Sequence, residues 1–126
     1  METEKERMLR GELYNAEDPE LAQERARAKE ICWQINHLPI SEEAQRNQLL
    51  VQLLGSTDGA FTILPDFWCD YGSNIHIGKN FFANHGLVVL DGAPVTIGHS
   101  VFIAPNVGQY TAGHPLNVRQ RNRYLE

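Results

Sequence analysis

The sequence predicts a mainly β protein, a parallel β-helix of hexapeptide repeats preceded by a small α-helical module. Three observations lead to this fold class. The composition changes near Gly55, the residues before it follow a helical period, and the residues after it follow a period of six. We therefore expect a helical module over residues 1–55 and a partial β-helix over residues 56–126, with a loop from about residue 108.

Composition and charge restrict the class of protein. The 126 residues, 42% hydrophobic and 21% charged, are typical of one globular domain. The net charge of -5 argues against a nucleic-acid partner, because such proteins normally present a basic stripe. Apolar runs fall far short of the ~20 residues that span a bilayer, so we expect no membrane partner.

The two cysteines give a guide to the compartment. Cys32 and Cys69 lie in segments of different character and form no pair motif. The first residues, METEKERMLRGE, are too charged for a secretory signal. We therefore expect reduced thiols in a cytoplasmic protein.

The first 55 residues predict two or three helices. A short charged helix comes first. Asp18 is a good N-cap for the next helix, Pro19 suits its first position, and Pro39 ends it. Ser41 is then expected to cap a further helix that stops at Gly55. This module has few aliphatic residues, so we expect it to pack against the rest of the chain.

A six-residue register replaces the helical period after Gly55. The blocks are PDFWCD, YGSNIH, IGKNFF, ANHGLV and VLDGAP, then IGHSVF and IAPNVG once Val95 and Thr96 are skipped. The first and fifth positions are mostly apolar and are expected to face inward, whereas the small second position is expected at a corner. Three hexads make a coil of 18 residues, so about two and a half coils follow Pro65. The insertion near residues 91–94 is expected to form a small outward loop at a corner. An antiparallel sheet with glycine turns is the alternative, but an alternation of period two does not fit these blocks.

Several ordered motifs resemble one enzyme family. The blocks YGSNIHIGKNFFAN, VTIGHSVFIAPNV and TAGHPL, with the helical stretch RMLRGELYNAEDPEL, resemble the maltose/galactoside O-acetyltransferases of the hexapeptide-repeat acyltransferase superfamily. The similarity runs from about Lys5 to Glu126. It implies a left-handed β-helix, a homotrimer with active sites between subunits, and transfer of acetyl from acetyl-CoA to a hydroxyl, typically of a sugar such as maltose, glucose or a galactoside.

The reaction implied by the resemblance needs a base. A sugar hydroxyl is a poor nucleophile at neutral pH, and imidazole suits its activation. No acyl-enzyme is required, because the thioester is already activated. His114, in a Gly-His-Pro sequence where the hexads give way to a loop, matches the catalytic base of the family. The alternative is an incidental loop histidine.

The resemblance also marks residues for the acceptor sugar. Asn84 matches a substrate-binding asparagine, and the alternative is a corner residue in a left-handed conformation. Asp70 and Asp91 match polar positions that line the acceptor site, and each is otherwise an ordinary turn aspartate. Asn15 stands where members of the family carry an aspartate. His85 is a further candidate to border the acceptor pocket.

Glu126 matches the glutamate of a Leu-Glu pair in the loop after the catalytic histidine. It is a candidate to orient or charge-stabilise His114. The remaining histidines are interpreted as structural or surface residues: His37, His76 and His99.

Members of the family extend beyond the region matched here, and their later coils supply most of the CoA wall. We therefore expect the CoA-binding residues mostly beyond residue 126. A competing interpretation is a truncated, catalytically impaired remnant with a structural or oligomerising role. A metal-dependent β-helix enzyme of the carbonic-anhydrase type is a third, but zinc needs about three clustered histidines and no His-x-His pair exists, so we expect no metal.

Overall fold

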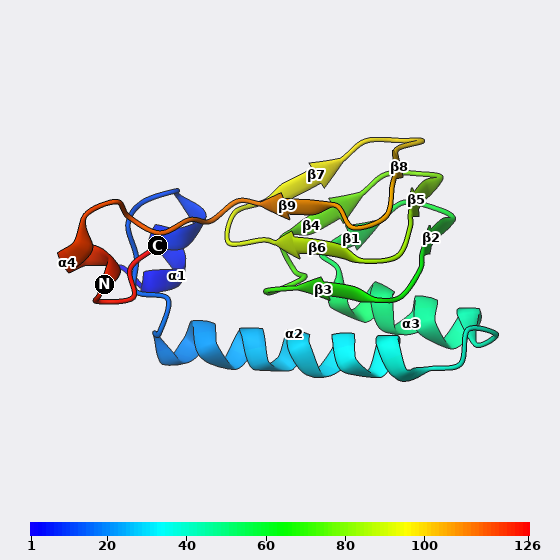
Figure 1. Ribbon diagram of the computed structural model, residues 1–126, viewed down its shortest axis with the longest axis horizontal. Helices are drawn as coiled ribbons and strands as arrows, with labels where there is room; N and C mark the ends of the chain where they lie inside the picture. Colours follow the sequence, from blue (N-terminus) through cyan, green and yellow to red (C-terminus); the bar gives the residue numbers. More distant parts are fainter.

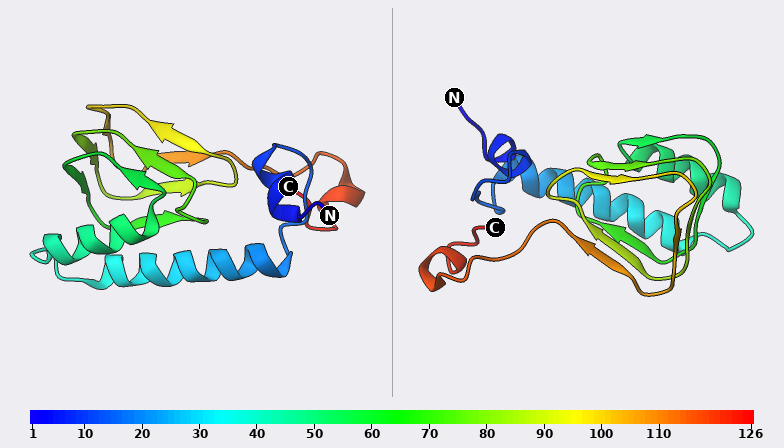
Figure 2. Two further views of the ribbon diagram at one scale, coloured as in Figure 1. Left: turned by 180° about the vertical axis from the view of Figure 1, so that it is seen from behind. Right: turned by 90° about the horizontal axis from the view of Figure 1, so that it is seen from above.

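A computed structural model describes residues 1–126 and shows a left-handed parallel β-helix with helices packed at one end (Figure 1). Nine short strands form three sheets, in the orders β1-β4-β7, β2-β5-β8 and β3-β6-β9, and every pair is parallel. Seen from above, the coils outline a triangle (Figure 2). The strands are β1 (Ser56–Thr57), β2 (Phe61–Ile63), β3 (Phe67–Cys69), β4 (Ile75–Ile77), β5 (Phe81–Ala83), β6 (Leu87–Leu90), β7 (Val95–Ile97), β8 (Phe102–Ile103) and β9 (Gly108–Tyr110).

The coil is longer than the hexads predicted. Phe61 pairs with Phe81 and Phe82 with Phe102, so each residue stacks on the one twenty positions later. The three-stranded sheets give three coils that begin at Ser56, so β1 and β2 precede Pro65, from which about two and a half coils were predicted. The skip at residues 95–96 was also misplaced, because these residues belong to β7. The extra residues lie at the corners 70–74 and 91–94, where the chain passes from one coil to the next.

The apolar first positions of the hexads form the interior, as predicted. All of them are buried: Tyr71, Ile77, Ala83, Val89, Ile97 and Ile103.

The reason for the small second position differs from the expected one. A Cβ on Gly78 would lie 2.8 Å from the Gly98 carbonyl carbon, so close stacking of successive coils excludes a side chain there. Among the second positions only Gly72 is left-handed, whereas the left-handed backbone recurs at the fourth position of four hexads, where glycine, asparagine and serine tolerate it. These residues are Asn80, Gly86, Ser100 and Asn106.

Two helices cover the open end of the first coil (Figures 1 and 2). α2 (Pro19–His37) lies against β3, and α3 (Glu43–Leu53) packs beside α2. Their buried residues join the β-helix interior in one apolar core, which shields the first coil from water. The core residues from the helices are Ala28, Cys32, Ile35, Leu50 and Leu53.

The helix ends match the sequence prediction in part. The Asp18 carboxylate accepts a hydrogen bond from the Glu20 amide at 3.1 Å, and Pro19 follows it, as predicted. The cap of α3 is Glu42, without a side-chain hydrogen bond, so the prediction of Ser41 was wrong. Gly55 lies beyond the end of α3. A Cβ there would lie 2.2 Å from the Ser73 carbonyl oxygen, so close approach of the backbone requires glycine.

Cys32 on α2 and Cys69 on β3 lie side by side, although no sequence motif paired them. Their sulfur atoms are 3.9 Å apart, and both thiols are free and fully buried. The hydrogen bond between them lowers the pKa of Cys32, whereas that bond together with burial raises the pKa of Cys69. The two thiols therefore lie in the packed interface between the helical module and the first coil.

After β9 the chain leaves the β-helix, forms the short helix α4 (Val118–Arg121) and returns to the N-terminal segment beside α1 (Glu4–Leu9) (Figure 1). Asn15 and Leu125 form an antiparallel bridge there. The basic residues near α4, Arg119, Arg121 and Arg123, are exposed. None of the helices combines the length and apolar character needed to cross a membrane.

Candidate functional site

A cleft of about 310 Å³ lies between the N-terminal loop and the loop that follows β9. Tyr14, Gly92, Thr111, His114 and Glu126 are among its lining residues. The lining comes from segments far apart in the sequence, which the coil register and the returning chain bring together.

Thr111 fixes the point at which the loop leaves the β-helix. Its hydroxyl donates to the Leu90 carbonyl at 2.7 Å and accepts from the Ala93 amide at 2.9 Å. The loop is therefore attached to the corner between β6 and β7. This attachment places His114, three residues later, at one side of the cleft.

His114 is exposed and lines the cleft. A Cβ on Gly113 would meet no atom within 4 Å, so the small residue before the histidine is not required by packing inside this chain. Arg121 supports the loop on the other side of His114, since its guanidinium donates to the Pro115 carbonyl at 3.1 Å and to the Leu116 carbonyl at 3.3 Å. The imidazole thus sits on a supported loop and faces a hollow.

Glu126 lines the same cleft as His114, but its hydrogen bond goes elsewhere. The Tyr14 hydroxyl donates to Glu126 Oε2 at 2.9 Å. Burial of Tyr14 raises the pKa of its phenol, and the adjacent Glu126 carboxylate raises it further, so the phenol remains a donor. Glu126 therefore bonds Tyr14 and not His114 as expected, although both Glu126 and His114 line the same cleft.

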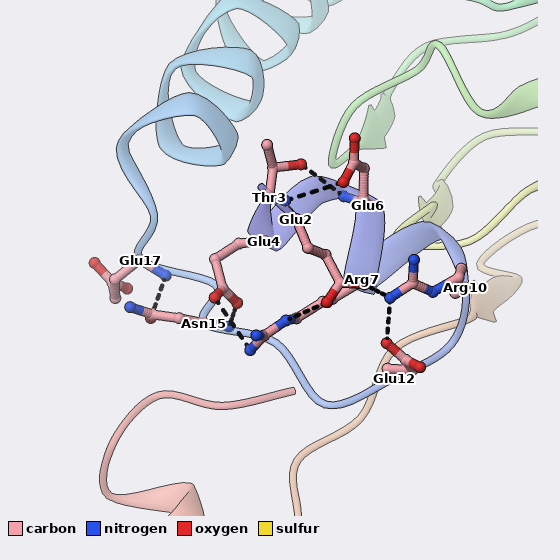
Figure 3. A network of polar contacts seen from close by, with 9 residues as sticks. All are labelled: Glu2, Thr3, Glu4, Glu6, Arg7, Arg10, Glu12, Asn15 and Glu17. Atoms are coloured by element: carbon pink, nitrogen blue, oxygen red, sulfur yellow. Dashed lines mark hydrogen bonds and ion pairs between the residues drawn. The ribbon is translucent and has the colours of Figure 1, made fainter.

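Asn15 lies beside the cleft rather than in it. It borders a second hollow together with Arg123 and Leu125. Its backbone amide donates to Glu4 Oε2 at 2.7 Å, and its side-chain oxygen accepts from the Glu17 amide at 3.0 Å (Figure 3). Asn15 therefore shapes the N-terminal turn in this chain.

Exposed ion pairs surround that turn (Figure 3). Arg7 lies 3.5 Å from Glu4 and 3.4 Å from Glu2, while Arg10 pairs with Glu12 at 2.7 Å. Because these groups are solvated, each pair is expected to contribute at most about 1 kcal/mol.

The Asp91 carboxylate is fully buried, so it does not reach the cleft, contrary to the expectation that it lines the acceptor site. Its oxygens accept from the amides of Tyr71 at 2.9 Å, Asp70 at 3.2 Å and Asn74 at 3.3 Å. Burial raises the pKa of Asp91, and the backbone hydrogen bonds oppose this effect. Asp91 is therefore a structural residue that holds the corner between β3 and β4.

Asp70 lies at the same corner and pairs with Lys29 of α2 at 3.4 Å. Its side chain is 22% exposed, so it remains accessible at the surface, outside the His114 cleft.

Asn84 and His85 lie at the opposite edge of the sheet from His114. They precede β6, whereas His114 follows β9, and the two strands are parallel neighbours. The Asn84 oxygen accepts from the His85 amide at 2.8 Å, and His85 Nδ1 contacts the Pro65 carbonyl. Asn84 is absent from the left-handed residues, so that alternative does not apply. One chain therefore does not bring Asn84 and His85 to the catalytic candidate.

Tyr14 and Thr111 are cleft residues that sequence reasoning did not single out. A signal for Tyr14 existed, because it is the aromatic residue of the Gly-x-x-Tyr stretch that precedes Asn15. For Thr111 the signal was its position beside the break in the hexads. The other three histidines are structural or lie at the surface, as expected: His37 stacks on Trp33, His76 contacts Ser56, and His99 accepts from the Lys79 amide. No group of three or more His, Cys, Asp or Glu residues is arranged to hold a metal ion.

The sequence of this chain matches known acetyltransferases. Residues 7–59 match the maltose acetyltransferase hexapeptide capping motif. A putative acetyltransferase of Saccharomyces cerevisiae is 52% identical over 122 residues, which cover 96% of this chain and 62% of the relative. A putative acetyltransferase of Staphylococcus aureus is 45% identical, with coverages of 98% and 63%.

Solved structures agree with these sequence matches. A maltose O-acetyltransferase from Clostridium difficile superimposes with a TM-score of 0.94 at 42% identity, covering 98% of this chain and 66% of that one. A galactoside acetyltransferase in complex with coenzyme A gives a TM-score of 0.93 at 34% identity, covering 99% and 62%. The chain thus spans slightly less than two thirds of the length of these relatives, and over that length the helices, coils and loop all correspond. In both sequence and fold, the chain therefore matches hexapeptide-repeat acetyltransferases of the maltose/galactoside type over nearly all of its own length.

Proposed function

We propose that this chain provides the acceptor side of a CoA-dependent O-acetyltransferase site, with His114 as the general base and a sugar hydroxyl as the acceptor. The single observation that carries the proposal is the exposed His114 on a supported loop, facing a cleft of the size that small ligands occupy. The alternative is a protein of this family with a structural or oligomerising role and no transfer activity.

The proposed reaction is a direct transfer. The sugar oxygen forms a bond to the acetyl carbonyl carbon while His114 takes the hydroxyl proton, and the carbon–sulfur bond of the thioester then breaks. The proton passes to the departing CoA sulfur, so free thiol and acetylated sugar are the products. Thr111 and Glu126 give the cleft polar groups that suit a sugar.

Similar structures support the choice of donor. The galactoside acetyltransferase holds coenzyme A, and a hexapeptide-repeat acetyltransferase from Vibrio cholerae, 36% identical, holds acetyl-CoA. We extend this donor to the present chain as part of the proposal. Free, buried cysteines are compatible with the cytoplasm, where acetyl-CoA is available.

The distance between the two groups of candidate residues favours a homotrimer. Asn84 precedes β6 and His114 follows β9, so at least one strand length separates them. A strand of four residues spans about 13 Å, too far for both groups to touch one hydroxyl. A neighbouring subunit that places its Asn84 and His85 against this His114 would complete the acceptor pocket.

The decisive experiment follows CoA thiol release from acetyl-CoA with a panel of sugars, including maltose, glucose and a galactoside. We expect acceptor-dependent release by the wild type and a loss of at least about 100-fold in His114→Ala. His99→Ala is the matched control, because it removes another exposed imidazole, one that bonds only the Lys79 amide.

Two outcomes would contradict the proposal. If His114→Ala retains the wild-type rate, the role of the base fails. If the wild type transfers acetyl to none of the sugars, the enzymatic function fails for this chain and the structural alternative is favoured.

A further inference from the structure

The segment that ends at Glu126 forms a ladder with the N-terminal loop. The main-chain amide of Tyr14 donates to the main-chain oxygen of Glu126 at 3.2 Å, and the amide of Glu126 donates to the main-chain oxygen of Tyr14 at 3.1 Å. The amide of Ala16 also donates to the main-chain oxygen of Tyr124 at 3.3 Å. The ladder joins the two walls of the cleft that contains His114. It therefore fixes the loop that carries the histidine against the start of the chain.

One side-chain hydrogen bond reinforces this ladder. The Tyr14 hydroxyl is directed at Glu126 Oε2, at 2.9 Å, and the tyrosine is only 5% exposed. A buried donor bonded to a carboxylate is strong and well oriented, because little water competes for it. Removal of the hydroxyl would release the carboxylate from its fixed position.

Glu126 lines the same cleft as His114, where a fixed negative charge can stabilise the protonated imidazole. The two residues together line the cleft of about 310 Å³, and they also line a separate hollow with Arg121 and Tyr124. When the imidazole takes a proton from an acceptor, it becomes cationic, and a nearby carboxylate stabilises that charge. The Tyr14 bond occupies Oε2 and leaves Oε1 without a partner in the chain.

We infer that Tyr14 is a positioning residue for acetyl transfer, which acts through Glu126 by holding its carboxylate in the cleft beside His114. This inference rests on the proposed function. It assigns a task to the tyrosine of the Gly-x-x-Tyr stretch, whose hydroxyl bonds Glu126 instead of the proposed base. Gly92 makes room for this arrangement, since a Cβ there would lie 3.3 Å from the Tyr14 hydroxyl.

The test compares Tyr14→Phe with Tyr71→Phe in the full chain. Tyr71 is the matched control because it is 4% exposed, belongs to the same apolar cluster and bonds Arg25 at 2.8 Å instead of Glu126. We expect Tyr14→Phe to lower kcat about tenfold, the effect of one charge-assisted hydrogen bond, with KM for acetyl-CoA unchanged. Tyr71→Phe should keep kcat within about twofold of the wild type.

A double-mutant cycle decides whether Tyr14 acts through the carboxylate. If it does, Tyr14→Phe combined with Glu126→Gln should lose no more kcat than Glu126→Gln alone. Multiplied losses, or equal losses in Tyr14→Phe and Tyr71→Phe, would overturn the inference.

Amide hydrogen exchange gives a readout that needs no turnover. Faster exchange at residues 124–126 is expected in Tyr14→Phe and not in Tyr71→Phe. A wild type without transfer activity would refute the proposed function alone, and the exchange comparison would still decide whether Tyr14 holds Glu126. Equal exchange in both variants would then overturn the inference by itself.

Discussion

Arg46 is a buried charge without a carboxylate partner. The residue is 2% exposed, its Nη1 donates weakly to the Ile40 carbonyl at 3.4 Å, and its Nε has no hydrogen-bond partner. Desolvation of such a group is costly, and an apolar residue of similar length often replaces it without loss.

We therefore expect Arg46→Met to leave stability unchanged or to raise the free energy of unfolding by about 1 kcal/mol, measured by urea denaturation. Arg27→Met, at an exposed position of α2, controls for the change of net charge and should stay within about 0.5 kcal/mol. A loss of more than about 1 kcal/mol in Arg46→Met alone would show that the guanidinium stabilises α3.

The burial of Asp91 predicts how the stability of the fold depends on pH. Its pKa is raised above the ordinary 3.8 by burial, so the folded chain binds this proton more tightly than the unfolded chain does. Its contribution to stability is then greatest below the unfolded pKa and falls as the pH rises through the folded pKa. Unfolding measured from about pH 3 upward should show the wild type losing stability relative to Asp91→Asn across that window. If the wild type instead gained stability relative to Asp91→Asn over this pH range, the backbone hydrogen bonds to the carboxylate would outweigh the effect of its burial.

At the scale of elements, two glycines beside short strands differ in what surrounds them. A Cβ on Gly55, between α3 and β1, would lie 2.2 Å from a backbone oxygen, whereas a Cβ on Gly98, after β7, would meet nothing within 4 Å. Gly55→Ala should cost about 2 kcal/mol or more, because backbone must move. Gly98→Ala should be neutral or slightly stabilising, because it only restricts the unfolded chain. Thermal unfolding of both variants tests the contrast, and equal midpoints would contradict it.

The hexad period predicted the buried face of the strands, because alternate side chains of a coil must face a shared interior. It predicted the insertion at the corner 91–94 but not the extra residues at the corner 70–74, because no break in the apolar register marks them. The contacts between Cys32 and Cys69 and between Tyr14 and Glu126 also escaped prediction. They join residues 37 and 112 positions apart, and no local pattern encodes such a distance.

At the scale of the whole molecule, the sequence placed His114 on the loop that follows the hexads, but it did not place the other candidate residues beside that loop. Asn84 matched a substrate-binding asparagine and His85 was a further candidate for the acceptor pocket, yet the fold puts both at the far edge of the sheet. In the proposed homotrimer this placement depends on the relation between subunits, which periodicity within one chain does not contain.

A mixing experiment tests this view of the assembly. We expect native mass spectrometry to show three copies of the 14.3 kDa chain. His114→Ala and Asn84→Ala should each be inactive alone, but co-refolded mixtures should regain part of the activity, because some interfaces then pair an intact His114 with an intact Asn84. The control is each variant refolded with itself. Absence of any recovery in mixed trimers would place both residues in one subunit's site.

The twenty-residue stack of coils also limits how this family can change in length. Because side chains alternate between the interior and solvent, loss of a single residue within a strand would turn every later strand of the coil inside out. Insertions and deletions should therefore survive only at the corners such as 91–94, where the chain already carries extra residues. Even there, Thr111 bonds that corner to the start of the histidine loop, so a change of length at one corner would alter the reach of the catalytic candidate several residues away.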